Sequence, residues 1–475
     1  MLECFDYDEA DPDVDGAAAV ATIGWGKAVA HEDDILLWSL SSVLDLEQLG
    51  LVSTDSYRIP GPPATMADLA PIFHPAAFNI LETKMDFAVD QLRALHERLL
   101  VSSPSYYDDT GAELIKTHFS ARNVIVFSVV FFQLSHRYIS LVHRPSFGSP
   151  DTSVALLLAV AFAGAARSPP HKEVLSIHTL ARLLEEFVFQ NLDNHMLNFH
   201  ATGLSRELIE TLQAAILIHL IQFMRQAGET RDRVRTTRLP KLVSISRKLQ
   251  LFATKHTHST DWLQFVETES RIRTAHWIAM ADWYQTVMFH MPPQVAVSEM
   301  AGDMPCSLDI WNARTAEDFR AILQPRVVPL HPWSIRRCIE GLMRPGGLGG
   351  GSGLTSVGWQ FSMSDLMLVV FGLTSVVISA ELTLAIDETA STWLAALEQW
   401  QCLWKDATRS LDKRAITSSG IERYSHEHAE LLQKIIEVAT TEPGSSKPPY
   451  LAGTGHDTVA ALHEFLVEFC QPGTA

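Results

Sequence analysis

The sequence has few cysteines, and no two of them lie close together. Five are spread along the 475 residues, at Cys4, Cys306, Cys338, Cys402 and Cys470. A structural zinc site needs ligand pairs about two to four residues apart, because one short turn must present both side chains to one ion. We therefore expect no zinc finger, no metal site and no bound cofactor in this chain. Scattered cysteines of odd number are also typical of a reducing compartment.

Basic residues are scarce as well. Lysine and arginine number 37 against 55 acidic residues, which gives a net charge of −18. Proteins that bind duplex DNA draw most of their affinity from basic side chains on phosphates. The chain as a whole is therefore predicted to be a poor DNA binder by itself.

Long apolar runs are rare too. The strongest one, Leu366 to Ala380, has about fifteen residues and falls short of the roughly 20 that span a bilayer. The first six residues, Met1 to Asp6, are acidic where a secretory leader is basic. We expect the apolar run to be a buried core helix, and we expect no membrane association.

Motifs of catalysis are absent. Histidine is followed by glutamate at His31, His96, His426 and His463, yet none of these pairs continues to H-E-x-x-H. The glycine run 346–353 matches neither a phosphate loop nor a nucleophile elbow. The adjacent aspartates at 33–34 and 108–109 do not extend to D-D-x-x-D, the pattern of a helical lipid- or terpene-handling enzyme. The sequence predicts no catalytic residue and no enzyme.

What the sequence does have is apolar residues at helical spacing along most of its length, with few strand patterns. Hydrophobic residues make up 47%, typical of a packed protein. Helices are predicted over residues 81–100, 114–141 (as one or two), 155–166, 205–223, 239–252, 261–289, 365–386, 392–410, 425–438 and 457–469. We predict an all-α fold: a large, bundle-like multi-helix domain over residues 76–475, interrupted by a flexible glycine-rich loop at 345–358.

One short stretch is locally basic. It contains Arg231, Arg233, Arg235 and Arg238 within an otherwise acidic chain. These side chains could make weak contacts with phosphate, but no aromatic residue lies among them to stack on a base. The alternative interpretation is a solvated loop between two helices.

Two distant segments carry the most specific pattern. The first runs from Phe131 through Leu-Val-His-Arg-Pro-Ser-Phe at 141–147, and the second begins at Trp262, includes Met-Pro-Cys at 304–306 and runs to Ala313. Their order and spacing resemble the regulatory (middle homology) domain of fungal-specific transcription factors, in the branch usually joined to Cys2His2 zinc fingers. The resemblance covers about residues 115–410. The motif residues that carry it are His143, Arg144, Pro145, Phe147, Glu269, Arg271, Arg273, Asp282, Pro292, Pro293 and Pro305.

Roles can be assigned to some of these residues from their chemistry. Arg144 lies among large apolar residues, so we expect its guanidinium to form a fork with a carboxylate or with helix carbonyls. Arg271 and Arg273 follow Glu267 and Glu269 at i,i+4 spacing, which predicts intra-domain ion pairs. The alternative for these arginines is contact with the carboxylate of a metabolite.

The resemblance implies a regulator of RNA polymerase II transcription in the nucleus. It implies partners among the transcription machinery or co-regulators, a small-molecule effector and a homodimer. DNA would be reached through a zinc-finger domain, expected upstream of this chain or on a partner, and zinc would be bound there. The alternative is a helical ligand-binding or scaffold protein with no direct transcriptional role.

The N-terminal segment, residues 1–75, differs in character from the rest. It is acidic and expected to be partly disordered, with one amphipathic helix between Asp33 and Leu49. An acidic helix with an apolar face can fold into the groove of a partner, which is how we interpret it, as an activation segment. The equally weighted alternative is that this helix packs on the domain. The docking face would consist of Leu36, Leu37, Trp38, Leu40 and Leu44.

Overall fold

The computed structural model describes most of the chain from residue 78 onward. The described ranges are 78–102, 111–136, 138–166, 180–223, 228–257, 261–323, 333–344, 360–412, 415–416, 419–441, 447–452 and 459–469. Within these ranges all regular structure is helical and no strand occurs, which confirms the predicted all-α fold. The acidic N-terminal segment and the glycine-rich loop lie outside the described residues, and the boundary at residue 75 stays a prediction.

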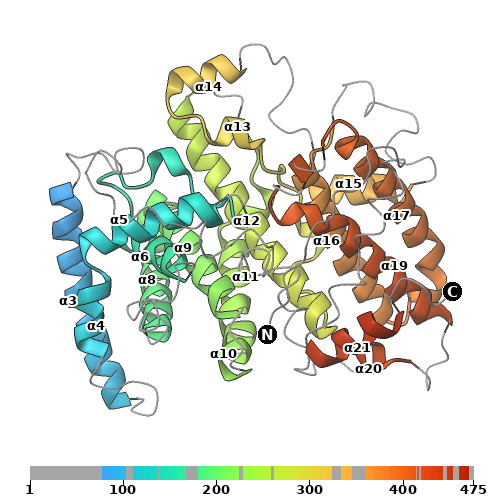
Figure 1. Ribbon diagram of the computed structural model, residues 1–475, viewed down its shortest axis with the longest axis horizontal. Coiled ribbons are helices and arrows are strands. Elements are labelled where there is room, and N and C mark those ends of the chain that lie inside the picture. Colours follow the sequence, from blue (N-terminus) through green and yellow to red (C-terminus); the bar gives the residue numbers. More distant parts are fainter. Residues whose placement is uncertain are drawn as a thin grey trace, which may run out of the picture.

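An N-terminal group of helices forms one half of the molecule (Figure 1). Its centre is α6, in which every residue from Ala155 to Ala165 is buried because α5, α8 and α9 pack around it. Small side chains let these helices approach closely. The members of the group are α3 (Phe78–Ser102), α4 (Gly111–His118), α5 (Ala121–Val130), the π-helix η4 (Phe131–Ser135), α6 (Val154–Ala165), α8 (Ala181–Thr202) and α9 (Arg206–Phe223).

Helix α12 (Trp262–Phe289) runs between the two halves of the molecule (Figure 1). Asp261 caps its start, since its carboxylate accepts from the backbone N–H of Leu263 at 2.9 Å. One side of α12 packs on α9 and on α11 (Leu239–Lys248), and another side packs on α16 (Met363–Leu382). Most of α12 is therefore buried, and it fixes the positions of the side chains that it carries.

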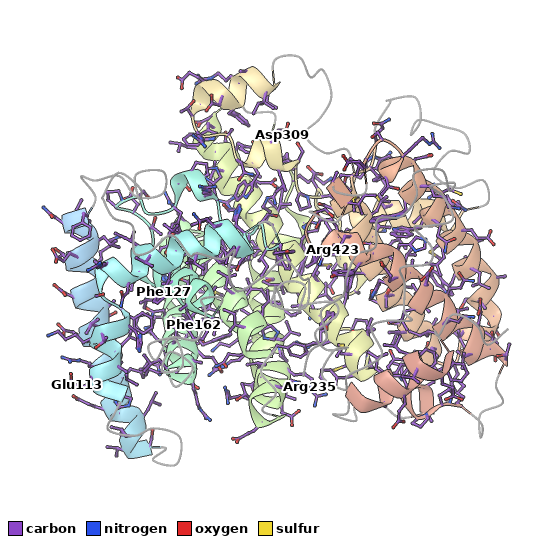
Figure 2. The ribbon with its side chains drawn as sticks, in the orientation of Figure 1. Glu113, Phe127, Phe162, Arg235, Asp309 and Arg423 are labelled. Carbon is purple, nitrogen blue, oxygen red and sulfur yellow. The ribbon has the colours of Figure 1, made fainter. Side chains whose placement is uncertain are left out.

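A C-terminal group completes the molecule. Trp400 of α17 donates its indole N–H to the carbonyl of Leu366 at 2.9 Å, and this hydrogen bond connects α17 to α16. Within α17, Trp400 also stacks on Trp404. The members are α15 (Ile335–Leu342), α16, α17 (Ile386–Thr408), the 3₁₀ helix η11 (Ile421–Tyr424), α19 (Ser425–Thr441), α20 (Pro449–Ala452) and α21 (Val459–Phe469). Side chains fill the space between the ribbons of both groups (Figure 2).

The apolar run Leu366–Ala380 lies within helix α16. This helix has 20 residues, so by length and composition it could cross a membrane. However, 78% of its most apolar window is buried against other helices, as predicted for a core helix. No other helix among the described residues meets the criteria for a membrane span.

The remaining helices mostly agree with the periodicity. Ser205 caps the start of α9, since its hydroxyl accepts from the backbone N–H of Leu208 at 3.1 Å. Helix α12 ends at Phe289, as predicted, and His290 after it adopts a left-handed conformation with φ 43°. Shorter elements connect the long helices: α10 (Gly228–Arg233), the π-helix η6 (Val234–Arg238), η7 (Leu251–Ala253), η8 (Val297–Glu299), α13 (Leu308–Trp311) and α14 (Ala316–Leu323).

Candidate functional site

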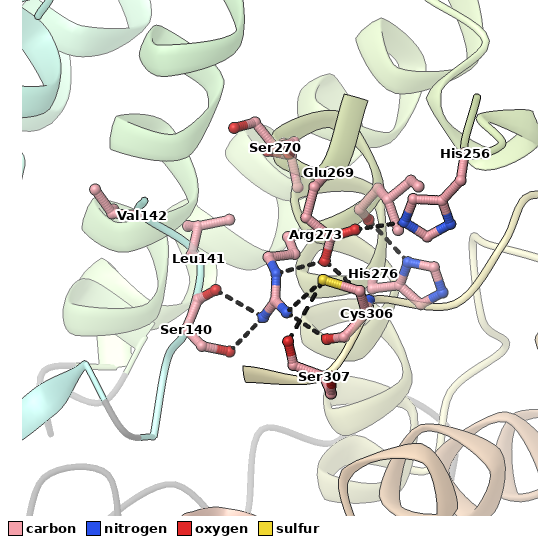
Figure 3. Close-up of polar contacts among 12 residues, drawn as sticks. Ser140, Leu141, Val142, His256, Glu269, Ser270, Arg273, His276, Cys306 and Ser307 are labelled. Atoms are coloured by element: carbon pink, nitrogen blue, oxygen red, sulfur yellow. Dashed lines mark hydrogen bonds and ion pairs between the residues drawn. The ribbon is translucent and has the colours of Figure 1, made fainter. Parts of the chain in front are cut away.

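The Arg273 guanidinium joins the two motif segments directly. From α12 it donates to the backbone carbonyl and hydroxyl of Ser140, at 3.0 and 2.7 Å, and to the carbonyl of Cys306 at 2.7 Å (Figure 3). Its Nε donates to Glu269 at 2.7 Å, and its face lies over the ring of Trp311. We call this arrangement the Arg273 clasp. It brings the chain just before the His-Arg-Pro motif against the Met-Pro-Cys segment.

Glu269 balances the charge inside the clasp. Its side chain is 0% exposed and accepts from Arg273, from the backbone N–H of Cys306 at 3.0 Å and from His256 Nε2 at 2.7 Å. Burial alone would raise the pKa of Glu269, but the Arg273 charge and His256 outweigh it and lower that pKa. The predicted intra-domain ion pair between Arg273 and Glu269 is therefore confirmed, and both partners are buried. The pair Arg271–Glu267, by contrast, lies at the surface with 3.9 Å between its charged atoms.

His256 is the second cation of the clasp, although no local sequence pattern pointed to it. Its Nε2 bonds Glu269, and its Nδ1 lies 3.3 Å from Asp303. Burial alone would lower the pKa of His256, but hydrogen bonds to Asp303 and Glu269 raise it to about 9. The imidazole is therefore charged at neutral pH.

This charge predicts a pH-dependent stability. A folded-state pKa above the unfolded value of 6.5 contributes stability that is complete below pH 6.5 and is lost as the pH rises through about 9. We expect the free energy of unfolding to fall by up to about 3 kcal/mol across that window from this group alone. His256→Gln should remove this part of the slope in urea titrations. His426→Gln, a change at a partly exposed histidine, should keep the pH dependence of the parent. The same pH dependence in the parent, His256→Gln and His426→Gln would contradict the raised pKa of His256.

The His-Arg-Pro motif lies beside the clasp. His143 is buried between Trp311 and Trp262, with ring centroids 4.6 and 5.8 Å away, and its Nδ1 is 2.9 Å from the hydroxyl of Ser146. Burial lowers the pKa of His143 to about 3, so the ring is neutral. His143 is therefore a packed core histidine.

Arg144 and Pro145 begin a short 3₁₀ helix, η5 (Arg144–Ser146), and Phe147 after it is buried. Among the described residues no carboxylate forms an ion pair with Arg144, so the fork predicted for it is not found there. Arg273 makes that kind of multiple contact instead.

Hydrogen bonds of Asp282 and Trp283 hold the C-terminal end of α12 against the segment that follows it. The Asp282 carboxylate accepts from the backbone N–H groups of Gln294 and Val295, both at 2.8 Å, which closes the turn containing Pro292 and Pro293. Trp283 donates its indole N–H to the carbonyl of Val295 at 2.8 Å. Burial raises the pKa of Asp282 to about 7 in spite of the two amide donors.

Two pockets flank the clasp. The first, of about 390 Å³, is bounded by the His-Arg-Pro loop, the start of α9 and the first turns of α12, and we call it the motif pocket. The second, of about 410 Å³, lies between α12 and α16 and includes Arg273, Cys306 and Pro305 in its wall; we call it the seam pocket. Both are large enough for a small organic molecule.

Cys306 in the wall of the seam pocket and Cys338 are both buried cysteines. Burial raises the pKa of the Cys306 thiol well above its usual value, and Cys338 is buried in the same way, so neither is an activated nucleophile. Across the described ranges no group of three or more metal-ligating side chains comes together. The arrangement is suited to binding and to holding two segments together.

The arginine-rich stretch is neither a loop nor a free basic surface. Its four arginines lie in α10 and η6, and three of their guanidinium groups pair with carboxylates. Arg233 and Arg238 both bond the fully buried Glu185, at 2.8 and 2.6 Å, and Arg238 also bonds Glu186. Burial alone would raise the pKa of Glu185, but these arginines lower it.

The other two arginines of the stretch are also occupied or covered. Arg235 pairs with Asp232 at 2.8 Å and lies over the ring of Phe289, and Arg231 is buried. The predicted solvated loop is wrong, and the predicted phosphate contacts are corrected for the same reason, because these guanidinium groups are engaged inside the protein.

The proposed docking face Leu36, Leu37, Trp38, Leu40 and Leu44 lies outside the described residues. It therefore stays a prediction.

Comparison with known proteins gives a consistent picture. The model of the "Fungal specific transcription factor domain" matches residues 130–400, which is more than half of the chain and includes both motif segments. "Transcription factor verF" of Penicillium polonicum is 28% identical over 211 residues, or 42% of this chain and 29% of that protein. The "Nicotinate catabolism cluster-specific transcription factor" of Emericella nidulans is 24% identical over 205 residues, or 41% of this chain and 22% of that protein.

The aligned part of this chain thus spans less than a third of either relative. No solved structure matches the chain.

Proposed function

Since the chain belongs to the family that carries the fungal specific transcription factor domain, and is a transcription regulator, we propose that it controls transcription by RNA polymerase II in the nucleus. The observation that carries the proposal is the family match over residues 130–400. The clasp supports it, because the two segments of the family pattern meet at one buried ion pair.

The body formed by α3 to α21 acts in this proposal as the regulatory part. Its two pockets beside the clasp suit a small-molecule effector, and its co-regulators or a second copy of the chain bind its surface. No enzymatic step is part of the proposal. Support comes from the buried thiols and from the lack of a metal-ligand group in the described part of the chain.

DNA reading is assigned to a zinc-finger domain of an upstream segment or of a partner, and zinc would bind there. The support is compositional: the net charge is −18, and no two of the five cysteines lie close together. Three arginines of the basic stretch, Arg233, Arg235 and Arg238, are already paired with the carboxylates of Glu185, Glu186 and Asp232, which leaves less positive charge for phosphate.

A reporter assay tests the proposal. The full chain is fused to a foreign DNA-binding domain and placed at a reporter that carries the matching site. We expect transcription to change several-fold relative to the foreign domain alone. Leu37→Ala with Trp38→Ala in the same fusion tests the acidic segment: lost output with an unchanged melting temperature would support its docking role. A fusion that is present in the nucleus but leaves the reporter unchanged would instead favour a scaffold with no transcriptional role.

A further inference from the structure

Two residues that line the motif pocket, Trp262 and Arg271, carry buried hydrogen-bond donors that no acceptor satisfies. These donors are the indole Nε1 of Trp262 and the Nε of Arg271, and neither has a hydrogen-bond partner among the described residues. Buried polar groups in native proteins are almost always paired, and an exception commonly marks a site where water or a ligand completes the bond. Both donors come from the first turns of α12, so they are held on a rigid element.

The positive charge of Arg271 is only weakly compensated by other side chains and is available for a ligand. Its nearest carboxylate, Glu267, is 3.9 Å away with 54% of its side chain exposed, too far for a hydrogen bond and well hydrated. In the seam pocket, by contrast, Arg273 donates to Ser140, Glu269 and Cys306. An anion entering the motif pocket would therefore meet a guanidinium without a close competitor.

The carboxylates of the motif pocket do not cancel this preference. Glu210 is buried and accepts from the backbone N–H of Ser153 at 2.6 Å and from Arg206 Nε at 2.7 Å. Asp151 lies at the exposed rim. The start of α9, which carries the positive end of that helix's dipole, also faces this pocket through Ser205 and Arg206.

Part of the remaining wall is apolar, with Phe147, Leu156, Ile209 and Val266, and part is polar but uncharged, with Ser146, Thr152, Gln213 and Ser270. A pocket of about 390 Å³ that has a guanidinium and apolar side chains in its wall suits a small molecule with one acidic group and a hydrocarbon body. One uncommitted guanidinium with a neighbouring indole N–H matches the two oxygens of a carboxylate.

We propose that the motif pocket binds a small organic carboxylate, with its two oxygens accepting from Arg271 and Trp262 and its apolar body packed against Phe147 and Ile209. This inference rests on the proposed regulatory function and names the chemical class of its effector. The ligand would bridge α12 to the start of α9 and to the His-Arg-Pro loop. Trp262 also packs on His143, so a ligand bound to Trp262 would change the packing of the His-Arg-Pro motif next to the clasp.

The test uses benzoate as the probe and the purified full chain, with binding measured by titration calorimetry. Benzamide, which has the same shape but no charge, is the matched control ligand. We expect saturable benzoate binding and affinity for benzamide lower by about tenfold or more.

Arg271→Gln should weaken benzoate binding by about tenfold, and Trp262→Phe by about fivefold. Arg336→Gln is the control variant, since Arg336 is an exposed arginine of α15 that pairs with Glu340 outside the pocket, and it should bind as the parent does. Circular dichroism and the melting temperature show whether each variant is folded.

Three outcomes would overturn the inference: no saturable benzoate binding, equal binding of benzamide, or full benzoate affinity in folded Arg271→Gln. Tighter binding of inorganic phosphate than of benzoate would also exclude an organic carboxylate as the ligand. The result is separable from the reporter assay. Benzoate binding that depends on Arg271 in a chain that leaves the reporter unchanged would keep the site and reject the transcriptional role.

Discussion

Replacing Arg273 by methionine is expected to lower the free energy of unfolding by about 3–5 kcal/mol. Methionine has a similar length and suits a buried position, so the change removes the charge and the hydrogen bonds without leaving a large cavity. What remains is Glu269, with 0% of its side chain exposed and its strongest cationic partner gone. The carbonyls of Ser140 and Cys306 lose a donor at the same time. Urea unfolding followed by circular dichroism measures the loss.

Arg271→Gln is the matched control for this prediction. It lies two residues earlier on the same helix, but its guanidinium is 3.9 Å from a half-exposed glutamate. A surface pair of this kind contributes about 0–1 kcal/mol, so the control should unfold close to the parent. Adding Glu269→Gln to Arg273→Met should recover part of the stability, because it removes the uncompensated charge. Similar losses for Arg271→Gln and Arg273→Met would show that burial does not strengthen the clasp.

The clasp also shows how far the sequence could lead. Spacing i,i+4 correctly paired Glu269 with Arg273, because that relation is local to one helix. Ser140 and Cys306 lie 133 and 33 positions away from Arg273, and no periodicity relates them. The sequence therefore predicted the ion pair itself but not its burial or its contacts with the two distant segments.

Several long helices with a regular apolar pattern were predicted well, but the 22-residue helix α8 was not predicted, and α17 begins at Ile386 and not at residue 392. The helix predicted at 81–100 is Phe78–Ser102, and the one at 261–289 begins one residue later, after its Asp261 cap. The arginine-rich stretch failed for a physical reason: its basic residues indicated solvent exposure, whereas Glu185 on α8 draws two of them inward. A carboxylate about fifty residues away in the sequence cannot be seen in the local composition.

The pockets could be anticipated only in part. The sequence offered a metabolite carboxylate as an alternative partner of Arg271. It did not show that Trp262 and the start of α9 at Arg206 line the same pocket, because only the fold brings these residues together. Likewise, His256 and Asp303 carry no motif of their own and enter the clasp because η7 and the Met-Pro-Cys segment pack against α12.

The second large effect is expected at Gly164 of α6. A Cβ atom there would lie 1.8 Å from the backbone carbonyl oxygen of Phe127 in α5 and 2.7 Å from its carbonyl carbon. Backbone atoms of a buried helix cannot move aside as a flexible side chain can, so Gly164→Ala must push α5 and α6 apart. We expect the free energy of unfolding to fall by about 3 kcal/mol, which is the upper end of the range for overpacking a core. This loss is expected even though alanine is more favourable than glycine in a helix by about 1 kcal/mol.

Gly372→Ala in α16 is the control that separates crowding from helix propensity. Gly372 is also buried within a helix, but an added Cβ would meet the side-chain ends of Ile339 and Ile335, at 2.8 and 3.0 Å. Those side chains can shift, and the propensity gain offsets the strain, so the free energy of unfolding should stay within about 1 kcal/mol of the parent. Equal behaviour of the two variants in urea would mean that α5 and α6 separate easily. A clear loss of unfolding free energy in Gly164→Ala alone means that α5 and the π-helix η4 after it are held firmly against α6. These two helices lead the chain to Ser140, so the same packing positions Ser140 for the Arg273 clasp.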